Sequence, residues 1–423
     1  MAAGAERALL ESAFHAAVAA CQAARCLPAR LPTTPPAGKT IVLGAGKAAA
    51  AMAEVAAQTL TGELTGLVVT RRGDGIGRRA RPIEIMEAAH PLPDDSSQQA
   101  AVRILELAHA AGAADRVIFL ISGGGSALLS CPAAGVTGAE KRALNQALLH
   151  SGATIAQINL VRAHLSKVKG GRLAEAALPA ELLTFIISDV VGDDPALVAS
   201  GPTVPAALDP ERARQILDDY GIAVPATVAA AIAAAKPVAA AAAHPVDIIA
   251  GAADALAAVA AFLTERGWRV LDLGADLEGE AAAVGRAHGR QVLARRAKQV
   301  NGERIAMISG GELTVTVTNP DGRGGPNLEY LTGLMLSLDG AAGVHALACD
   351  SDGIDGSEDN AGGYLAPDSQ QRAITAGLDP AALLAANRSY DIFHAIGGLI
   401  KTGPTQTNVN DIRIILIDPA GRD

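Results

Sequence analysis

Short apolar runs alternate with longer segments of helical periodicity along the first half of the chain. Residues 5–26 form the first helical segment, because Leu10, Phe14 and Val18 recur at intervals of four. Buried strands are predicted at Thr40–Leu43, Gly66–Thr70, 117–121 and Leu182–Ser188. Helices are predicted between these strands, after Lys47, at about 95–112 and at about 138–150. This alternation predicts a mostly parallel sheet covered by helices on both faces.

The pattern changes between about residues 205 and 244, where helix and Ala/Pro-rich connector replace the alternation. A second alternating region follows, with helices at 252–265 and 279–299. Its strands are predicted at Asp247–Ala250, Arg269–Leu273, Arg304–Ser309, Leu313–Thr318, Gly343–Ala348 and Ile412–Ile417. We therefore predict two α/β domains, the first Rossmann-like. Their limits are an N-terminal helix at 1–32 that packs on either domain, then 33–240 and 241–423.

Composition narrows the class of protein. With 50% apolar and 19% charged residues the chain of 423 residues is globular, and its net charge of −9 argues against nucleic acid as the main partner. Glu6 and Glu11 stand where a signal peptide would be apolar. The Ala-rich stretch Thr227–Ala243 contains Lys236 and Pro237 and is too weakly apolar to span a membrane. We expect a cytoplasmic protein with no membrane partner.

Two glycine-rich loops each follow a predicted strand and precede an Ala-rich helical segment. The first is Gly44-Ala45-Gly46-Lys47, and the second is Ser122-Gly123-Gly124-Gly125-Ser126. Such turns aim free backbone N–H groups at an anion, and glycines let a phosphate approach closely. Two such loops, one with a lysine, indicate a protein that binds phosphate or carboxylate groups, and we expect phosphate at both. Each loop taken alone is equally well explained as a tight turn, and Ala49 stands where a dinucleotide fingerprint has its third glycine.

Acidic side chains gather on two loops that follow predicted strands. Asp189, Asp193 and Asp194 lie on one, and three more aspartates lie between Asp350 and Gly356. In a parallel sheet such positions meet at the carboxyl edge. Carboxylates at this density favour a cation such as Mg²⁺, held through one or two of them and through substrate phosphates. The alternative is turn and helix-capping chemistry, for which aspartate is also typical.

Basic and polar side chains supply the remaining candidates. Residues 159–172 carry four Lys/Arg around a Gly-Gly turn, including Lys167 and Lys169. Arg323 stands among glycines, where a guanidinium can grip a carboxylate or phosphate with two hydrogen bonds. The loop 401–411, with Thr402, Thr405 and Asn408, is rich in hydroxyl and amide groups. The alternatives are a solvated helix face for the first run and a loop that bonds to its own backbone for the last.

Together these segments resemble one family, the glycerate 2-kinases, whose members have also been named hydroxypyruvate reductases. The resemblance rests on Gly44–Ala48, Ala89–Pro91, Pro93–Asp94, Ile121–Leu128, Asn159–Arg172, Ile187–Val190, Gly192–Asp193, Ser200–Thr203, Ser309–Glu312, Asp352–Gly356 and Thr402–Thr405. It extends over nearly the whole chain. The sequence departs at Pro326 and Leu328, where Arg and Gln are expected, and at Gln406, where Gly is usual. These departures leave substrate affinity and fine specificity open.

The resemblance implies ATP-dependent phosphorylation of D-glycerate at its 2-hydroxyl, with the active site in the cleft between two α/β domains. We expect Lys47 and Arg323 to hold the glycerate carboxylate and the transferring phosphoryl, and Asp189 to orient or deprotonate the 2-hydroxyl. Ser122 to Ser126 would line the phosphate path. Asp193, Glu312 and Asp352 are candidates for binding Mg²⁺ or for fixing the cations. Which acid is the base and which binds metal stays open.

Two other functions remain open at this stage. A hydroxypyruvate reductase would need an NAD(P)H site, and the incomplete fingerprint at Ala49 argues against one. A non-catalytic anion-binding protein would need the glycine loops but not two acidic clusters. The expected partners are therefore D-glycerate and ATP, with Mg²⁺. The sequence allows a homo-oligomer but indicates neither its size nor the nucleotide selectivity.

Overall fold

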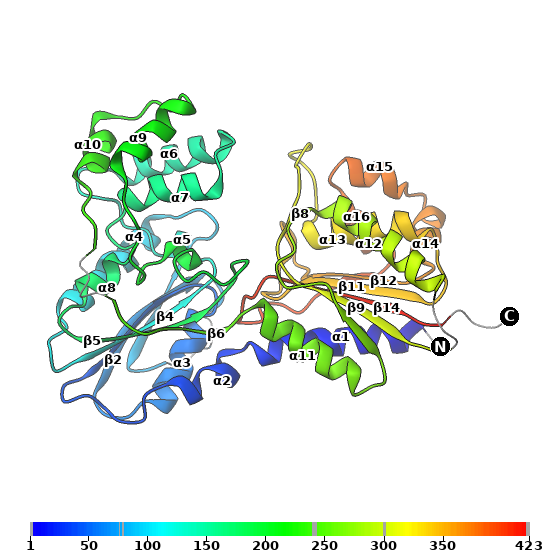
Figure 1. Ribbon diagram of the computed structural model, residues 1–423, viewed down its shortest axis with the longest axis horizontal. Coiled ribbons are helices and arrows are strands. Elements are labelled where there is room, and N and C mark those ends of the chain that lie inside the picture. The colour runs from blue at the N-terminus through cyan, green and yellow to red at the C-terminus, as the bar shows by residue number, and fades with distance from the viewer. Residues whose placement is uncertain (1–2, 76, 78–79, 239–242, 299–301, 420–423) are drawn as a thin grey trace. The chain divides into compact units, whose positions relative to one another are not determined.

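The computed structural model describes residues 3–75, 77, 80–238, 243–298 and 302–419. They form two compact units. The parallel-sheet unit comprises Cys26–Ser188 and Asp194–Ile249, and the mixed-sheet unit comprises Met1–Arg25, Asp189–Asp193 and Ala250–Asp423. Each is an α/β structure, which confirms the predicted fold class (Figure 1). The predicted domain boundary at residues 240 and 241 lies outside the described residues.

The parallel-sheet unit has one six-stranded sheet in the order β3-β2-β1-β4-β5-β6. The strands are β1 (Thr40–Ala45), β2 (Leu64–Arg71), β3 (Ile83–Ala88), β4 (Arg116–Ser122), β5 (Glu181–Ile187) and β6 (Val246–Ala250). β1 runs parallel to both β2 and β4, and every residue of β1 and β4 is buried. Their continuous apolar runs are therefore those of central strands, as predicted.

Two strands of this sheet differ from the sequence-based expectation. The sequence does not predict β3, because its polar residues, Glu84 and Glu87, are three apart and do not alternate with the apolar ones. The strand predicted at Asp247–Ala250 in the second alternating region is β6. It forms the edge of the first sheet instead, beside β5. The Thr184 N–H donates to the Pro245 carbonyl at 3.1 Å at this edge. The strand therefore belongs to the first sheet although a long helical segment separates it from β5 in sequence.

Two sets of helices complete the parallel-sheet unit. α3 (Ala49–Thr59) follows β1, and α4 (Asp95–His109) follows β3; right-handed crossovers in opposite directions place them on opposite faces of the sheet. α6 (Gly138–His150), α7 (Ile155–His164), α9 (Pro210–Asp219) and α10 (Ala226–Ala234) pack around a core of their own, which includes Leu148, Val161 and Ile216. Figure 1 shows these four helices gathered together. We call them the helical subdomain.

The mixed-sheet unit has a six-stranded sheet in the order β13-β12-β11-β14-β9-β7. Its strands are β7 (Arg269–Asp272), β9 (Ile305–Ser309), β11 (Val344–Asp350), β12 (Gly362–Leu365), β13 (Leu399–Ile400) and β14 (Asp411–Ile417). β14 pairs antiparallel with both β11 and β9, whereas β7 runs parallel to β9. The predicted strand Leu313–Thr318 is shorter: β10 (Leu313–Thr314) pairs only with β8 (Gly279–Glu280).

Helices cover both faces of the mixed sheet. α1 (Ala3–Ala20), which α2 (Ala23–Cys26) follows, packs with α11 (Ala252–Thr264) on one face, and α12 (Ala281–Arg296) and α13 (Pro326–Leu338) cover the other (Figure 1). The predicted N-terminal helix thus packs within this unit. Shorter helices, α14 (Ser369–Thr375), α15 (Pro380–Ala385) and α16 (Ser389–Ala395), complete it. No helix among the described residues is long and apolar enough to cross a membrane.

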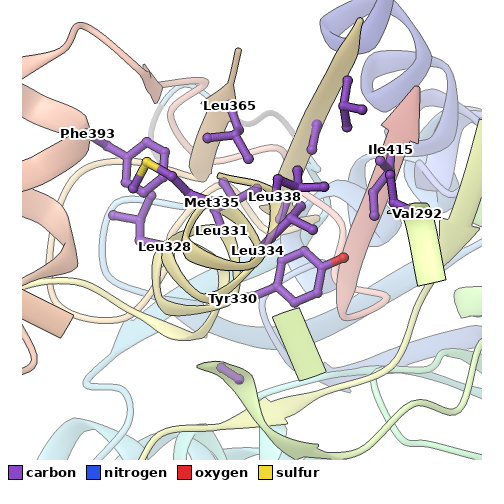
Figure 2. Packing of buried hydrophobic residues seen from close by; sticks show 14 of the residues in the cluster. Val292, Leu328, Tyr330, Leu331, Leu334, Met335, Leu338, Leu365, Phe393 and Ile415 are labelled. Atoms are coloured by element: carbon purple, nitrogen blue, oxygen red, sulfur yellow. The ribbon is translucent and has the colours of Figure 1, made fainter. Parts of the chain in front are cut away.

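Helix α13 is the main element that the sequence did not predict. It is buried nearly all round, between α12 on one side and β11 and β12 on the other, and Figure 2 shows Leu328, Leu331, Leu334 and Met335 packed in this core. A helix without an exposed face has no amphipathic period to detect. Gly333 lets α12 approach closely, since a Cβ there would lie 2.3 Å from the Ala282 carbonyl oxygen.

Candidate functional site

The two glycine loops flank the point where the first sheet reverses its direction of winding. From β1 the chain moves toward β2 and β3, whereas from β4 it moves toward β5 and β6. In open parallel sheets the crevice at this switch point is where ligands bind. Gly44 to Lys47 end β1, and Ser122 to Ser126 end β4. The topology therefore brings together the two segments that the sequence singled out.

The loops interlock through Gly46 and Ser122. The Ser122 side chain is fully buried, and its Oγ accepts a hydrogen bond from the Ala48 N–H at 3.0 Å. Lys47 N donates to the Gly123 carbonyl at 2.9 Å. Gly46 has a φ of 137°, and a Cβ there would lie only 2.1 Å from Ser122 Oγ. Gly46 and Ser122 thus hold the two loops together, and protein fills the space beside Gly46.

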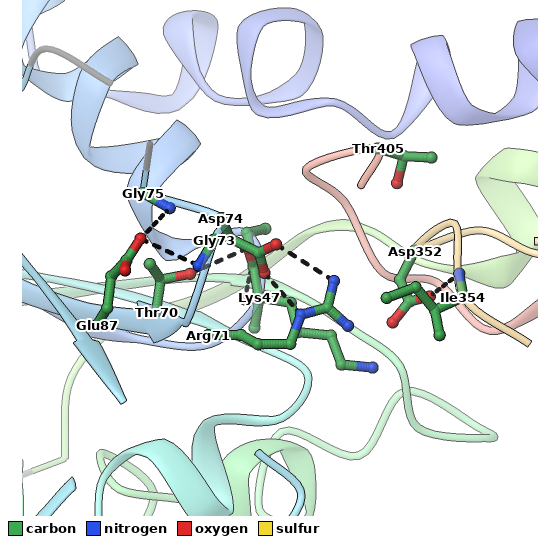
Figure 3. A network of polar contacts seen from close by, with 12 residues as sticks. Lys47, Thr70, Arg71, Gly73, Asp74, Gly75, Glu87, Asp352, Ile354 and Thr405 are labelled. Carbon is green, nitrogen blue, oxygen red and sulfur yellow. Dashed lines mark hydrogen bonds and ion pairs between the residues drawn. The ribbon is translucent and has the colours of Figure 1, made fainter. Parts of the chain in front are cut away.

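Lys47 and His90 both approach the triple glycine. A Cβ on Gly124, whose φ is 78°, would lie 3.2 Å from Lys47 Cγ and 3.1 Å from His90 Nε2. The Lys47 carbonyl accepts a hydrogen bond from Thr70 Oγ1 at 3.3 Å, which fixes the backbone at this lysine (Figure 3). The positive φ and the close approach of both side chains therefore favour glycine at 124. His90 was not among the predicted site residues, although it stands in one of the segments that carried the resemblance.

Ser126 lies at the centre of a second group of polar contacts. Its Oγ accepts hydrogen bonds from Lys169 Nζ at 2.6 Å and from Arg162 Nη2 at 3.2 Å, and it lies 2.7 Å from Ser200 Oγ. The Ser126 carbonyl also accepts from Lys169 Nζ, at 3.0 Å. Lys169 is only 2% exposed, whereas its predicted companion Lys167 is exposed. Arg162 and Ser200 complete this group and were not predicted individually.

Lys141 of α6 joins Arg162 and Lys169 in what we call the cation cluster. Its side chain is 4% exposed, and burial, with a further contribution from Arg162, lowers its pKa to about 8. Burial also lowers the pKa of Lys169 well below its usual value, with Arg162 and Lys141 adding to the effect. Lys141 Nζ and Arg162 Nε have no hydrogen-bond partner among the described residues. Nothing in the sequence points to Lys141, which there resembles one charge on the solvated face of a helix.

In the mixed-sheet unit, the loops 350–356 and 402–408 pack against each other. A Cβ on Gly353 would lie 2.1 Å from the Gly403 carbonyl oxygen. Thr405 N donates to the Asp352 carbonyl at 3.2 Å, and Thr402 Oγ1 donates to the Gly403 carbonyl at 2.8 Å. Asn408 Nδ2 donates to Asp189 Oδ2 at 3.0 Å. The structure thus places Asp352, Thr402 and Thr405 on adjoining loops, and it pairs Asp189 with Asn408.

Turn and capping contacts account for much of the acidic loop. Asp355 accepts hydrogen bonds from the N–H groups of Asn327 and Leu328 at 3.0 and 3.1 Å, so it caps the N-terminus of α13. Burial raises its pKa to about 7. Asp350 accepts a hydrogen bond from Asp352 N at 2.8 Å. Asp352 Oδ1 accepts one from Ile354 N, also at 2.8 Å (Figure 3). These are the contacts of a tight turn.

The acidic residues do not form a complete metal site by themselves. No group of three or more His, Cys, Asp or Glu side chains among the described residues is placed to hold a metal ion. Asp352 is 3% exposed. A Cβ on Gly251 would lie 2.8 Å from each Asp193 carboxylate oxygen, which places that carboxylate at the start of α11. Mg²⁺ at either aspartate would need phosphate oxygens and water for its other ligands, which is the usual case for this ion.

Arg323 and Glu312 differ in their surroundings. Two hydrogen bonds join Arg323 to Glu358, at 2.9 and 3.0 Å, and a third reaches Asp391 at 3.3 Å. Glu358 in particular raises the pKa of Arg323 further. Glu312 is exposed. The carbonyls just before it, of Gly310 and Gly311, accept hydrogen bonds from buried Arg413, an unpredicted arginine within an apolar strand.

Comparison with known proteins gives these features a context. A family model described as a domain of unknown function, DUF4147, matches residues 9–233, and the MOFRL family model matches residues 305–411. A D-glycerate 2-kinase from Thermotoga maritima is 37% identical, over 90% of this chain and 91% of that protein. A crystal structure of glycerate kinase from the same organism superposes with a TM-score of 0.88 at 34% identity, covering 98% of this chain and 100% of the other.

The names of the relatives are not uniform. A protein from Agrobacterium vitis, 48% identical over 97% of this chain and 94% of its own length, is provisionally named a hydroxypyruvate reductase. Both names were part of the resemblance seen in the sequence. The family models, the kinase relatives and the superposed structure extend over nearly all of the chain, glycine loops included. The chain therefore belongs to the glycerate 2-kinase family.

Proposed function

We propose that this protein is an ATP-dependent kinase that phosphorylates D-glycerate at the 2-hydroxyl and yields 2-phosphoglycerate. The observation that carries the proposal is the position of Lys47, on interlocked glycine loops at the switch point of the parallel sheet. Backbone N–H groups and a lysine at such a point suit the phosphates of a nucleotide. The glycerate kinase names of several relatives support the choice of substrate.

Phosphoryl transfer depends mainly on positioning and on neutralising charge. Lys47 supplies a cation beside the triple-glycine loop, since its Cγ would lie 3.2 Å from a Cβ on Gly124. Asp189, oriented by Asn408, would accept the proton of the 2-hydroxyl. Asp193 and Asp352 would hold Mg²⁺ together with nucleotide phosphates, and the ion would supply neutralisation of the phosphate charge. Thr402 and Thr405 would support the loop that carries Asn408.

A hydroxypyruvate reductase is the second candidate, because a relative 48% identical carries that name. Arg71 ends β2, a place where an arginine can bind the 2′-phosphate of NADP. Here, however, Arg71 binds Asp74 at 3.1 and 3.3 Å (Figure 3). Ser122 fills the space beside Gly46 that a cofactor pyrophosphate would approach. These contacts favour the kinase.

A paired assay tests the proposal. The purified chain is given ATP, Mg²⁺ and D-glycerate in one reaction, and hydroxypyruvate with NADH or NADPH in another. We expect turnover only in the first. Phosphorus NMR then identifies the product, because a phosphate on C2 couples to one proton and a phosphate on C3 couples to two. Nicotinamide oxidation without ADP formation would establish the reductase, and ADP formation with a C3 product would refute the 2-kinase.

A further inference from the structure

We infer that Lys141, Arg162 and Lys169, together with the hydroxyls of Ser126 and Ser200, form a binding site for one doubly charged phosphate group. The identity of the molecule that carries this phosphate rests on the proposed function, whereas the existence of the site does not. A nucleotide and a phosphorylated hydroxy acid both carry such a phosphate group, and the experiment below distinguishes between them.

The site is assembled from five separate segments of the parallel-sheet unit. Lys141 comes from α6 and Arg162 from α7 of the helical subdomain, and Lys169 precedes the Gly170-Gly171 turn. Ser126 and Ser200 come from the loop after β4 and from the 3-10 turn at Val198–Ser200. Ser126 Oγ joins the group: Lys169 lies 2.6 Å from it, Ser200 Oγ 2.7 Å and Arg162 Nη2 3.2 Å. Lys169, Arg162 and Ser200 thus converge on Ser126, and Lys141 lies close enough to help lower the pKa of Lys169.

The cluster has no opposing charge. None of its three cations forms an ion pair with a carboxylate among the described residues. Asp94 lines the same small cavity as Lys141, but its carboxylate accepts from Ser97 N at 3.1 Å and binds Arg72 at 2.5 Å. Cys131, which also lies near Lys141, is a thiol whose pKa burial raises. Buried charges without partners cost several kcal/mol, so an anion would offset a large penalty.

The number of charges and donors favours phosphate over carboxylate. Three cations exceed what one carboxylate can neutralise, whereas a phosphate monoester carries close to two negative charges at neutral pH. Lys141 Nζ and Arg162 Nε still have hydrogen bonds to donate. A phosphate presents three oxygens in a tetrahedral arrangement, and it accepts such charge-assisted hydrogen bonds from several directions. The hydroxyls of Ser126 and Ser200 adjust to either role, because each can donate or accept.

The experiment compares wild-type protein with Lys141→Met, which keeps the length of the side chain and removes its charge. Lys236→Met, at an exposed lysine of the same unit, is the matched control. Urea unfolding gives the stability of each free protein. Calorimetric titration then measures the binding of inorganic phosphate, ATP, ADP, 2-phosphoglycerate and D-glycerate. Turnover is not measured, so the result does not depend on whether the chain is a kinase.

We expect free Lys141→Met to be at least as stable as wild type, and to bind phosphate-bearing ligands at least about tenfold more weakly, with Lys236→Met unchanged. Loss of affinity for ATP and ADP alone assigns the site to the nucleotide, and loss for 2-phosphoglycerate alone to the phosphorylated acid. A less stable Lys141→Met with unchanged phosphate binding would show a structural lysine and overturn the inference. Weakened binding of D-glycerate alone would make this a carboxylate site. Arg162→Gln provides an independent repeat if Lys141→Met does not fold.

Discussion

Lys169 Nζ lies 2.6 Å from the hydroxyl oxygen of Ser126, in a setting where the lysine is almost fully buried. The same oxygen also accepts from Arg162. In the free protein this one hydroxyl is therefore the shared acceptor of a buried lysine and a half-buried arginine. The contact links the triple-glycine loop to the segment 159–172, two stretches that the sequence had singled out for separate reasons.

Ser126→Ala should lower both stability and activity. The substitution leaves Lys169 and Arg162 without this acceptor, which we expect to cost about 1–3 kcal/mol in the free energy of unfolding. We expect kcat/KM to fall by at least about tenfold, since Ser126 ends the triple-glycine loop that we propose binds phosphate. Urea unfolding and a steady-state kinase assay measure the two effects. Ser151→Ala, at the end of α6, serves as control; equal behaviour of the two variants would remove Ser126 from the site.

The cation cluster should make the stability of the free protein depend on pH in the alkaline range. Lys141 has a pKa of about 8 when folded and about 10.4 when unfolded. Between these values the unfolded chain holds more protons, so the free energy of unfolding should rise with pH by up to ~3 kcal/mol. Lys169 acts in the same direction, whereas Cys131, with its raised pKa, acts in the opposite one.

The contribution of Lys141 is isolated by comparing wild type with Lys141→Met at pH 7.5, 8.5 and 9.5 in urea. The advantage of the methionine variant should shrink as the pH rises, because the wild-type lysine loses its charge. A difference between the two proteins that stays constant across this range would mean that Lys141 keeps its ordinary pKa.

Sequence patterns predicted the amphipathic helices, which have one apolar face, and the central strands, which are continuous apolar runs. Buried central strands such as β1 and β4 appear as apolar runs, and the glycine loops follow them directly. Helix α13 escaped because it is covered on all sides and shows no period. Helix capping was the alternative for the acidic loop, but it could not be assigned to Asp355, because the N–H groups that donate to this carboxylate belong to α13.

The sequence predicted which loops form the site, but not which of their side chains point into it. Lys167 and Lys169 are two residues apart and look equivalent in the sequence, yet one is exposed and the other is buried beside Ser126. Lys141 lies on a helix whose neighbours Glu140 and Arg142 are charged, so the sequence suggests a solvated face. Only the packing of the helical subdomain shows that Lys141 points inward. Which charges converge is thus a property of tertiary structure.

Asp355→Ala should destabilise the mixed-sheet unit without a specific effect on catalysis. The N–H groups of Asn327 and Leu328 are buried and would lose their acceptor, which we expect to cost about 2 kcal/mol or more. Thermal unfolding measures the effect, with Asp359→Ala at an exposed position as control. Normal stability combined with lost Mg²⁺ dependence would instead make Asp355 a metal ligand.

Two substitutions test whether the Arg323 guanidinium binds substrate or only Glu358. Arg323→Lys should lower kcat/KM by at least about tenfold, or ~1.4 kcal/mol, because an ammonium cannot reproduce the planar fork. Glu358→Gln weakens the pair that holds Arg323. It should leave KM for D-glycerate unchanged or lower it. If both variants raise KM equally, the ion pair is needed to shape the loop, and Arg323 does not itself grip the substrate.

Asp189→Asn should lower turnover far more than it weakens glycerate binding. Asparagine preserves the size of the side chain, but it cannot take a proton and offers one acceptor oxygen in place of two. Asn408 donates to Asp189 Oδ2, so Asn408→Ala should give a milder loss of kcat, by releasing the carboxylate from its orientation. Asp194→Asn, at an exposed aspartate of the same loop, is the control. Recovery of Asp189→Asn at raised Mg²⁺ would make Asp189 a metal ligand and shift the search for the base to Asp352. Unchanged turnover and unchanged metal dependence would leave Asp189 with a structural role, and the proposed proton acceptor would be wrong.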